Sequence, residues 1–470
     1  MLRPDDAPIR ARGAWALAMV AALSSMIVLA SIGAASATPG RQRWVKRYDR
    51  NALSDYGNDA AVSSDGSTVF VTGASLSHPG NDDIATIAYA ASDGSRKWAR
   101  RYDGPGSAFD WGAAIAGSPD GSIVVVTGIS NGFGSLDDFI TVAYDASDGK
   151  RLWVRRYTWA ADTNDAAAAV VVSPDSQTVY VTGQSQSVSS SSTAYTTIAY
   201  AAPDGARVWR TVSAGTTDGN ALALSPDGTR VYVTGGIDTG STIDYETIAL
   251  DASTGAAVWE ETFDGPANGD DAGMAIGVGP SGSRVYVTGR SDGATTRGNF
   301  ATIAYGAADG SQRWVRRSHA PAEVYSTMSL AVAPNGSRVV VAGWGERDGH
   351  DQFATVAYGA AGAEAWSDHY DGPRDQESRG VDVEISPDSG QAIVTGTSSG
   401  AKGLADFVTI SYGLTHGPRL WVRRYDGPDG ISDNASAVAI GPTGSRAFVV
   451  GASDSIDRHS DYATVCYRLR

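Results

Sequence analysis

The chain has 470 residues, a formal net charge of −15 and 42% hydrophobic residues. That hydrophobic content is enough for a large core and excludes wholesale disorder. The acidic balance argues against nucleic acid or an anionic membrane as a partner, because both attract basic surfaces. The single cysteine, Cys466, excludes an intrachain disulfide framework and a multi-cysteine zinc site. The 56 glycines and 12 tryptophans together favour an all-β repeat protein with many turns.

Residues 1–37 have the three-part pattern of a secretory signal peptide. A basic head that carries Arg3, Arg10 and Arg12 precedes an apolar run over residues 14–32, and the small residues Ala35-Ser36-Ala37 follow. This order predicts cleavage before Thr38 and a secreted, extracellular protein that has no membrane contact after cleavage. The alternative is an uncleaved anchor, because the apolar run is nearly long enough to span a membrane.

An internal repeat runs through the rest of the chain. Its marker is a tryptophan that recurs at spacings of 50 to 56 residues, at Trp44, Trp98, Trp153, Trp209, Trp259, Trp314, Trp366 and Trp421. Two short patterns recur eight times with it, one like Val71-Thr72-Gly73 and one like Thr86-Ile87-Ala88-Tyr89. Each repeat has four short apolar or β-branched runs separated by turn residues such as Ser-Pro-Asp-Gly. Four strands in each of eight repeats predict an all-β, eight-bladed β-propeller that forms a single domain over residues 38–470.

The two ends of the chain complement each other. The last repeat stops at Arg470, where the turn into a fourth strand is expected, and the segment from Gly40 to Trp44 carries the missing glycine and tryptophan. We therefore expect the N-terminal segment to form the outer strand of the C-terminal blade, which leaves no unpaired sheet edge there.

Residues 249–259 (ALDASTGAAVW) resemble the tryptophan-docking motif of the eight-bladed quinoprotein (PQQ) dehydrogenase-like propellers. The Val-Thr-Gly and Ser-Pro-Asp-Gly patterns also resemble those of bacterial secreted β-propeller repeat proteins and of lactonase-like propellers. These resemblances imply the fold over about residues 40–470, and they leave the function open because propellers have many functions. A quinoprotein alcohol dehydrogenase is expected to carry adjacent cysteines beside its cofactor, so the lone Cys466 makes PQQ an unexpected cofactor.

In a four-stranded blade, the loops after the second and fourth strands lie on the same face of the ring. These loops are long and variable here, so we name this the variable-loop face and expect a binding site on it. An aspartate recurs on this face just before the inner strand, at Asp55, Asp110, Asp165, Asp218, Asp271 and Asp433. Two interpretations are open: an acidic ring that attracts Ca²⁺ or a cationic ligand, or, as we expect, side chains that bond the backbone of the neighbouring turn. We expect the tryptophans to form core between blades.

Departures from the repeat indicate candidate functional residues. Most inner strands carry alanine or glycine at two alternating positions, whereas the seventh repeat has Asp382 and Glu384 and the first has Asp59. Residues two apart on a strand point the same way, and these two repeats flank the eighth. Charged groups at crowded positions need a partner. Either Arg374 or Arg379 forms an ion-pair network with them, or Asp382 and Glu384 bind a metal ion such as Ca²⁺.

The sixth and seventh repeats also depart from the pattern near their loops. Tyr325 replaces the recurrent aspartate, and Trp344, His350 and Glu377 fall in the loops of this sector, which also contains Arg379. We expect these residues, with the three acidic residues named above, to form a ligand-binding site.

Together these features predict a secreted, non-catalytic and monomeric propeller that binds a protein, a glycan or a small ligand through its variable-loop face. The alternative is a divergent propeller enzyme, either a quinone-dependent oxidoreductase or a lactonase-like hydrolase or lyase. The sequence indicates no particular catalytic residue.

Overall fold

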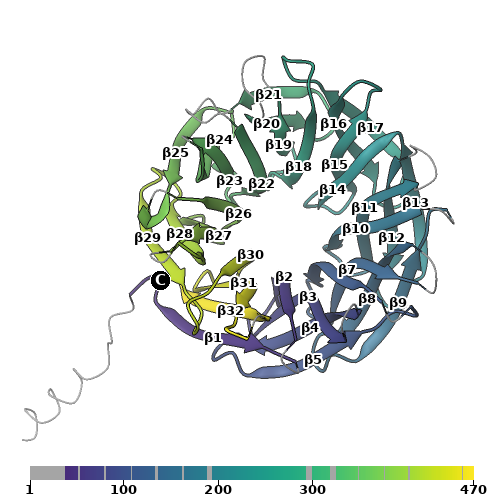
Figure 1. The fold of residues 1–470 in the computed structure, drawn as a ribbon. Helices are drawn as coiled ribbons and strands as arrows, with labels where there is room; N and C mark the ends of the chain where they lie inside the picture. The colour runs from purple at the N-terminus through teal and green to yellow at the C-terminus, as the bar shows by residue number, and fades with distance from the viewer. Residues whose placement is uncertain are drawn as a thin grey trace, which may run out of the picture.

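In the computed structural model, the chain forms a ring of eight four-stranded antiparallel sheets, the blades, around a central axis (Figure 1). The structure describes residues 38–470 except for short segments at 51–52, 79–80, 107, 133–135, 161–162, 188–192, 293–298, 318–323, 348, 375, 401–402 and 458. The expected signal peptide lies outside the described residues and stays a prediction. In the described part, no helix is long and apolar enough to cross a membrane; a single helical turn, η1, spans Gly372–Arg374.

Blades one to seven each take four consecutive strands, with the first strand next to the axis and the fourth on the outside (Figure 1). Blades one and two contain β2 (Asp55–Val62), β3 (Thr68–His78), β4 (Asn81–Ala90), β5 (Arg96–Tyr102), β6 (Asp110–Gly117), β7 (Ile123–Asn131), β8 (Asp137–Asp145) and β9 (Arg151–Tyr157). Blades three and four contain β10 (Thr163–Val172), β11 (Thr178–Ser187), β12 (Thr193–Ala201), β13 (Arg207–Ala214), β14 (Thr216–Leu224), β15 (Arg230–Asp238), β16 (Ile243–Asp251) and β17 (Ala257–Phe263).

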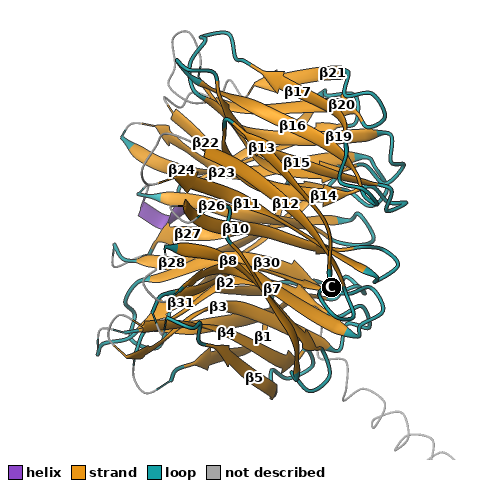
Figure 2. Ribbon diagram, turned by 90° about the vertical axis from the view of Figure 1, so that its right-hand side faces the viewer, coloured by secondary structure: helices purple, strands orange, loops and turns teal. Residues whose placement is uncertain are grey.

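Blades five to seven continue the same pattern around the ring. Blade five contains β18 (Asp271–Val278), β19 (Arg284–Ser291), β20 (Asn299–Gly306) and β21 (Gln312–Arg317). Blade six contains β22 (Val324–Val332), β23 (Arg338–Arg347), β24 (His350–Gly359) and β25 (Glu364–Tyr370), and blade seven contains β26 (Ser378–Ile385), β27 (Gln391–Ser399), β28 (Ala405–Gly413) and β29 (Arg419–Tyr425). Seen edge-on, the ring carries loops on both of its faces (Figure 2). The eight-bladed propeller predicted from the repeats is confirmed.

Blade eight joins the two ends of the chain. It contains β30 (Asp433–Ile440), β31 (Arg446–Asp454) and β32 (Ser460–Arg468), and its outer strand is β1 (Gln42–Tyr48). β1 pairs antiparallel with β32, with Tyr48 opposite Tyr462, and the Gly40 N–H donates to the Arg468 carbonyl at 2.7 Å. This is the arrangement expected from the complementary chain ends, and it satisfies the backbone of β32 on both sides.

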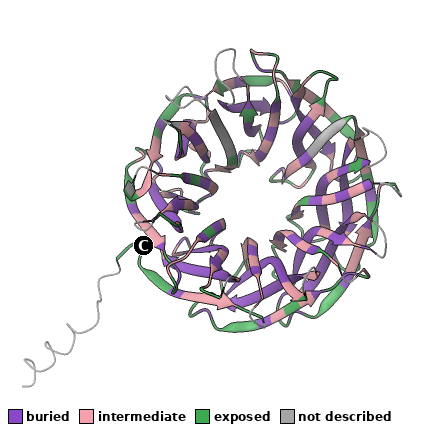
Figure 3. Cartoon of the chain, viewed as in Figure 1, coloured by how far each residue is buried: buried purple, intermediate pink, exposed green. Residues whose placement is uncertain are grey.

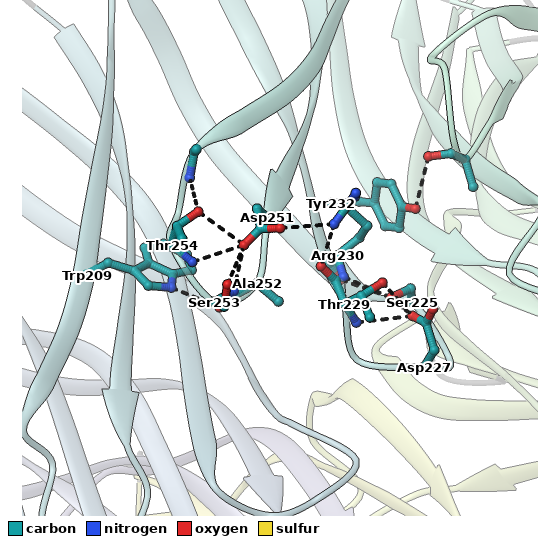
Figure 4. A network of polar contacts seen from close by, with 12 residues as sticks. Trp209, Ser225, Asp227, Thr229, Arg230, Tyr232, Asp251, Ala252, Ser253 and Thr254 are labelled. Carbon is teal, nitrogen blue, oxygen red and sulfur yellow. Dashed lines mark hydrogen bonds and ion pairs between the residues drawn. The ribbon is translucent and has the colours of Figure 1, made fainter.

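The repeated tryptophans join each blade to the next. Seven of them donate the indole N–H, at 2.8–3.2 Å, to a carbonyl in the turn between the third and fourth strands of the next blade. For Trp44 of blade eight, the next blade around the ring is blade one. Figure 4 shows one such bond, from Trp209 to Ala252, beside the turn in which Asp251 accepts from Ser253 and Thr254. The expectation that the tryptophans form core between blades is confirmed.

A glycine in each of these turns is required for two separate reasons. Gly255 has φ +73°, which side chains disfavour, and a Cβ built on it lies 2.6 Å from the ring of Trp209. Gly40 has φ +74°, and its Cβ would lie 2.7 Å from the Trp421 ring. Gly40 thus takes the same place in blade eight, although it comes from the other end of the chain.

The middle strands of the blades hold most of the core, and the outer strands carry much of the exposed surface (Figure 3). Residues Ile84 to Tyr89 of β4, for example, are all buried because both faces of a middle strand pack against neighbouring blades. Each first strand carries a register shift near its centre, such as between Gly57 and Asp59 in β2 and between Gly380 and Asp382 in β26. A bulge of this kind redirects the side chain that follows it.

Candidate functional site

Three acidic side chains, which we name the inner-strand carboxylates, are the first candidate group: Asp59, Asp382 and Glu384. Asp59 lies on β2, and the other two lie on β26, on the strands that line the axis of the ring (Figure 1). Asp59 and Asp382 directly follow the bulges of their strands. The three interact electrostatically, because the charges of Asp382 and Asp59 both act on Glu384. The structure therefore brings together the three residues selected from the departures in the repeat.

The hydrogen bonds of two inner-strand carboxylates join neighbouring blades. Asp59 accepts from the backbone N–H of Ala60 at 2.7 Å and of Ile115, in blade two, at 2.8 Å. Asp382 accepts from the Ser329 hydroxyl of blade six at 2.7 Å and from the Val438 N–H of blade eight at 2.8 Å. Asp382 therefore links three successive first strands, and this role explains why a carboxylate is tolerated there.

The pKa values of these groups are raised. Burial raises the pKa of Asp59 to about 7, against the effect of its two backbone hydrogen bonds. Burial also raises the pKa of Asp382. Desolvation, together with the charges of Asp382 and Asp59, raises the pKa of Glu384 to about 8, although the Glu384 side chain is exposed. Near neutral pH the group therefore holds protons that isolated carboxylates have lost.

The expectation that Arg379 pairs with Asp382 and Glu384 is wrong. The Arg379 guanidinium forms an ion pair with Asp351 of blade six and lies 5.1 Å from the centre of the Trp344 ring. Arg379 precedes the bulge and Asp382 follows it, so the two side chains leave β26 in different directions. The side chain of Arg374, the other expected partner, lies outside the described residues.

A pocket of about 340 Å³ lies between blades seven and eight on the variable-loop face. Glu377 and Arg379, both selected from the sequence, line it at the start of β26. Its apolar surface comes from Val381, Ala405 and Ala435, and its uncharged polar groups come from Thr397, Ser399 and Asn434. The pocket thus combines apolar lining residues with two opposite charges, a composition that is typical of sites for organic ligands or peptide segments.

The remaining candidates occupy different places. Trp344 is half-buried on β23 and contacts Arg379, so it belongs to the wall beside the pocket. His350 is exposed at the start of β24 and is not a pocket residue. Tyr325 pairs with Gly345 in the register of β22, but its side chain lies outside the described residues. The pocket residues of β27, β28 and β30 were not predicted, because they follow the repeat and carry no sequence signal of their own.

The recurrent aspartates bond turn backbone, as expected. Their carboxylates accept from an N–H five or six residues earlier, at 2.6–3.0 Å, in Asp55, Asp110, Asp165, Asp271 and Asp433. The side chain of Asp218 lies outside the described residues. Burial raises the pKa of Asp110 and Asp433 to about 6. The aspartate thus recurs at this position because its carboxylate accepts a hydrogen bond from the turn backbone.

Three Gly-x-Ser-x-Gly segments, centred on Ser130, Ser291 and Ser398, occur in the sequence, and none of them forms the elbow of a hydrolase. In a hydrolase such a serine stands exposed on a sharp strand-to-helix turn. Here all three are fully buried on β7, β19 and β27, and each accepts a hydrogen bond from the arginine of its own blade's fourth strand. These serines belong to the blade framework.

The fold and the repeated tryptophan turns define the class of the protein, a PQQ-like eight-bladed β-propeller. Within this class the chain belongs to the family described as outer membrane protein assembly factor BamB, which matches residues 194–453, more than half of the chain. No curated protein sequence matches the chain.

Solved structures share the fold at low sequence identity. Sqt1 from Chaetomium thermophilum, bound to the N-terminus of the ribosomal protein L10, has a TM-score of 0.59 at 14% identity and covers 91% of this chain and 100% of its own. BamB from Moraxella catarrhalis has a TM-score of 0.53 at 16% identity, with 91% and 99% covered. The quinohemoprotein alcohol dehydrogenase ADHIIG from Pseudomonas putida HK5 has a TM-score of 0.53 at 12% identity, with 91% and 76% covered. At these identities the likeness concerns the fold alone.

Proposed function

We propose that this protein is an exported, non-catalytic propeller that binds a polypeptide segment in the pocket between blades seven and eight. The observation that carries the proposal is the pocket itself, because it lies on the variable-loop face and contains Glu377 and Arg379 beside apolar lining residues. An extended peptide offers small apolar side chains, backbone polar groups and charges, and each of these finds a counterpart there.

The wall of the pocket supports a protein partner in particular. Arg379 is half-exposed and is held in place by the Asp351 carboxylate and the Trp344 ring. Tryptophan and arginine are enriched among the residues that dominate protein–protein binding, and a fixed arginine loses little conformational entropy when it binds. The family assignment and the peptide complex of Sqt1 are consistent with this role. The export part of the proposal depends on the sequence pattern of residues 1–37.

Site-specific photo-crosslinking tests the proposal in cells that express the full chain. A benzoylphenylalanine at Ser399, in the pocket, is expected to form a covalent adduct with a polypeptide, and Arg379→Ala in the same chain is expected to remove most of it. The matched control is Ser281, which lies in a pocket of about 300 Å³ on the opposite face, lined by repeated turns. Equal adducts from both positions would contradict the proposal.

A second candidate, a divergent propeller enzyme, is favoured by one observation. Glu384, with a pKa raised to about 8, and Asp59, with a pKa raised to about 7, have the values of general acids or bases. The PQQ variant of this candidate does not fit, because Cys466 is fully buried in the cluster around Trp44 and cannot line a cofactor site near the axis. A PQQ titration in the presence of Ca²⁺ is expected to give no bound-cofactor spectrum, and a bound spectrum would revive this candidate.

A further inference from the structure

An ion pair between an aspartate and an arginine recurs around the variable-loop face. The aspartate lies near the start of the third strand of a blade, and the arginine lies on the fourth strand, three residues after the repeated tryptophan. The pairs are Asp83–Arg101 at 2.7 Å, Asp138–Arg156 at 2.6 Å, Asp406–Arg424 at 3.0 Å and Asp461–Arg47 at 2.8 Å. All four aspartates are at least nine-tenths buried, so each has a cation beside it where water cannot screen its charge.

Blade six does not repeat this pair. Gln352 stands at the aspartate position and His369 stands at the arginine position. Asp351, one residue before the repeated position, forms an ion pair with Arg379 from the first strand of blade seven. The aspartate at the repeated position therefore has an arginine partner in four blades.

Blade four breaks this rule. Asp244 occupies the aspartate position on β16, but Thr262 stands at the place of Arg101, and Ala272 stands at the place of Arg379. Asp244 is only 9% exposed, and its Oδ1 atom is buried without a hydrogen-bond partner. Among the residues that the structure describes, no arginine or lysine forms an ion pair with it.

The charges around Asp244 are of its own sign. Burial raises the pKa of Asp244, and the charges of Asp264 and Asp270 raise it further, while a side-chain hydrogen bond with Thr242 lowers it only in part. Arg317 is the nearby cation: its charge acts on Asp271 and opposes the effect of burial on the Asp271 pKa. Its guanidinium donates to the Ser291 hydroxyl at 2.5 Å and to the Ser291 carbonyl at 2.9 Å. The corresponding Arg156 makes the same bonds to Ser130 beside an aspartate cluster that also has Arg101. Arg317 thus corresponds to Arg156 and not to the missing arginine, and its charge is not among those that act on Asp244.

Asp244 faces two other carboxylates. One oxygen each from Asp244, Asp264 and Asp271 lies within 4.8 Å of the others, and Asp271 is fully buried. The same triangle occurs at Asp83, Asp103 and Asp110 and at Asp406, Asp426 and Asp433. The latter two triangles contain Arg101 and Arg424. Three similar groups of carboxylates thus differ in one respect, the presence of the arginine.

We propose that Asp244, Asp264 and Asp271 bind one divalent metal ion, Ca²⁺, which supplies the positive charge that arginine supplies to the equivalent clusters. Ca²⁺ takes six to eight oxygen ligands in irregular geometry, and a pair of buried carboxylates with an exposed third leaves room for carbonyl and water ligands. The ion joins β16 and the loop after β17 to β18, and so connects blade four to blade five. We expect weak binding, with Kd on the order of 0.1–1 mM.

Calorimetric titration of the purified chain with CaCl₂ alone tests the proposal. The wild type is expected to bind one equivalent, and its Tm is expected to rise by about 3 °C at a hundredfold excess over Kd, for an unfolding entropy that is typical of a chain this long. Asp244→Asn is expected to abolish both effects. Thr262→Arg is also expected to abolish them, and to keep in EDTA a Tm at least as high as that of the wild type, because the arginine restores the pair. A wild-type chain that ignores Ca²⁺ would overturn the proposal.

Two further variants locate the ion. Arg101→Thr gives the cluster of Asp83, Asp103 and Asp110 the composition of the blade-four cluster. This variant is expected to bind a second equivalent of Ca²⁺. If it binds no second equivalent, the idea that the ion and the arginine are interchangeable is overturned. Glu384→Gln is expected to leave Ca²⁺ binding unchanged. Loss of binding in Glu384→Gln, with retention in Asp244→Asn, would place the ion at the inner-strand carboxylates and refute the assignment.

Discussion

The closure of the ring by β1 leads to a quantitative prediction for Trp44. Trp44 and Trp98 hold the same place in neighbouring blades, where they are 8% and 5% exposed. Their indole N–H groups donate to the carbonyls of Ala91 and Ala146 at 3.2 and 3.1 Å. Each ring lies between two other aromatic rings, with centroid distances of 5.7–6.3 Å. They differ in connection, because Trp98 is continuous in sequence with its blade, whereas Trp44 reaches blade eight from the other end of the chain.

The cost of Trp44→Ala follows from these contacts. Loss of a buried tryptophan side chain costs about 3–5 kcal/mol, and the abandoned Ala91 carbonyl adds roughly 1–3 kcal/mol. For an unfolding entropy of about 0.9 kcal/mol per kelvin, typical of a chain this long, we expect Tm to fall by about 4–9 °C. If β1 is docked as firmly as the other outer strands, Trp98→Ala produces a fall of the same size.

Thermal unfolding followed by calorimetry measures both variants, with Gln42→Ala, an exposed position of β1, as the control. A fall for Trp44→Ala that is less than a quarter of the fall for Trp98→Ala would refute the reasoning. It would mean that the outer strand of blade eight contributes little to the closed ring.

Two other predictions concern pH and the turns. The folded-state pKa of Glu384, about 8, lies above its ordinary value of 4.5, so the native state binds the proton more tightly and stability falls as pH rises from about 5 to 8. Glu384→Gln is therefore expected to raise Tm at pH 8.5 and to reduce the Tm difference between pH 5.5 and 8.5. An unchanged difference would contradict the pKa shift. Gly255→Ala adds a Cβ that would lie 2.6 Å from Trp209 at φ +73°, whereas a Cβ on Gly240, at φ +90°, would have nothing within 4 Å. In chemical unfolding, we expect Gly255→Ala to lower the free energy of unfolding by about 2–4 kcal/mol and Gly240→Ala by only about 1 kcal/mol. Equal losses would show that the tryptophan contact contributes nothing.

The fold could be predicted because each repeated residue has a local physical role. The tryptophan fills the space between blades, the turn glycine leaves room for its ring, and the aspartate before the inner strand bonds a turn N–H. Such requirements recur in every blade, so they are visible as a repeat in one sequence. The outer strand of blade eight could be inferred in the same way, from the place of Gly40 and Trp44.

The candidate site could be predicted only in part. The proximity of Asp59, Asp382 and Glu384 followed from their places on blades that flank blade eight. Their partners did not follow, because nearness in sequence suggested Arg379, while the bulge of β26 separates the directions of Arg379 and Asp382. The sequence shows Thr262 at the third position after Trp259, where other repeats have an arginine. The consequence for Asp244 could not be predicted, because it depends on ion pairs that only the structure shows.

The measurement that tests the central claim most directly is photo-crosslinking from the pocket between blades seven and eight. We expect benzoylphenylalanine at Ser399 to capture a polypeptide in cells, Arg379→Ala to remove that adduct, and the same probe at Ser281 on the opposite face to capture none. An adduct that forms from Ser281, or one at Ser399 that ignores Arg379→Ala, would contradict a binding site on the variable-loop face.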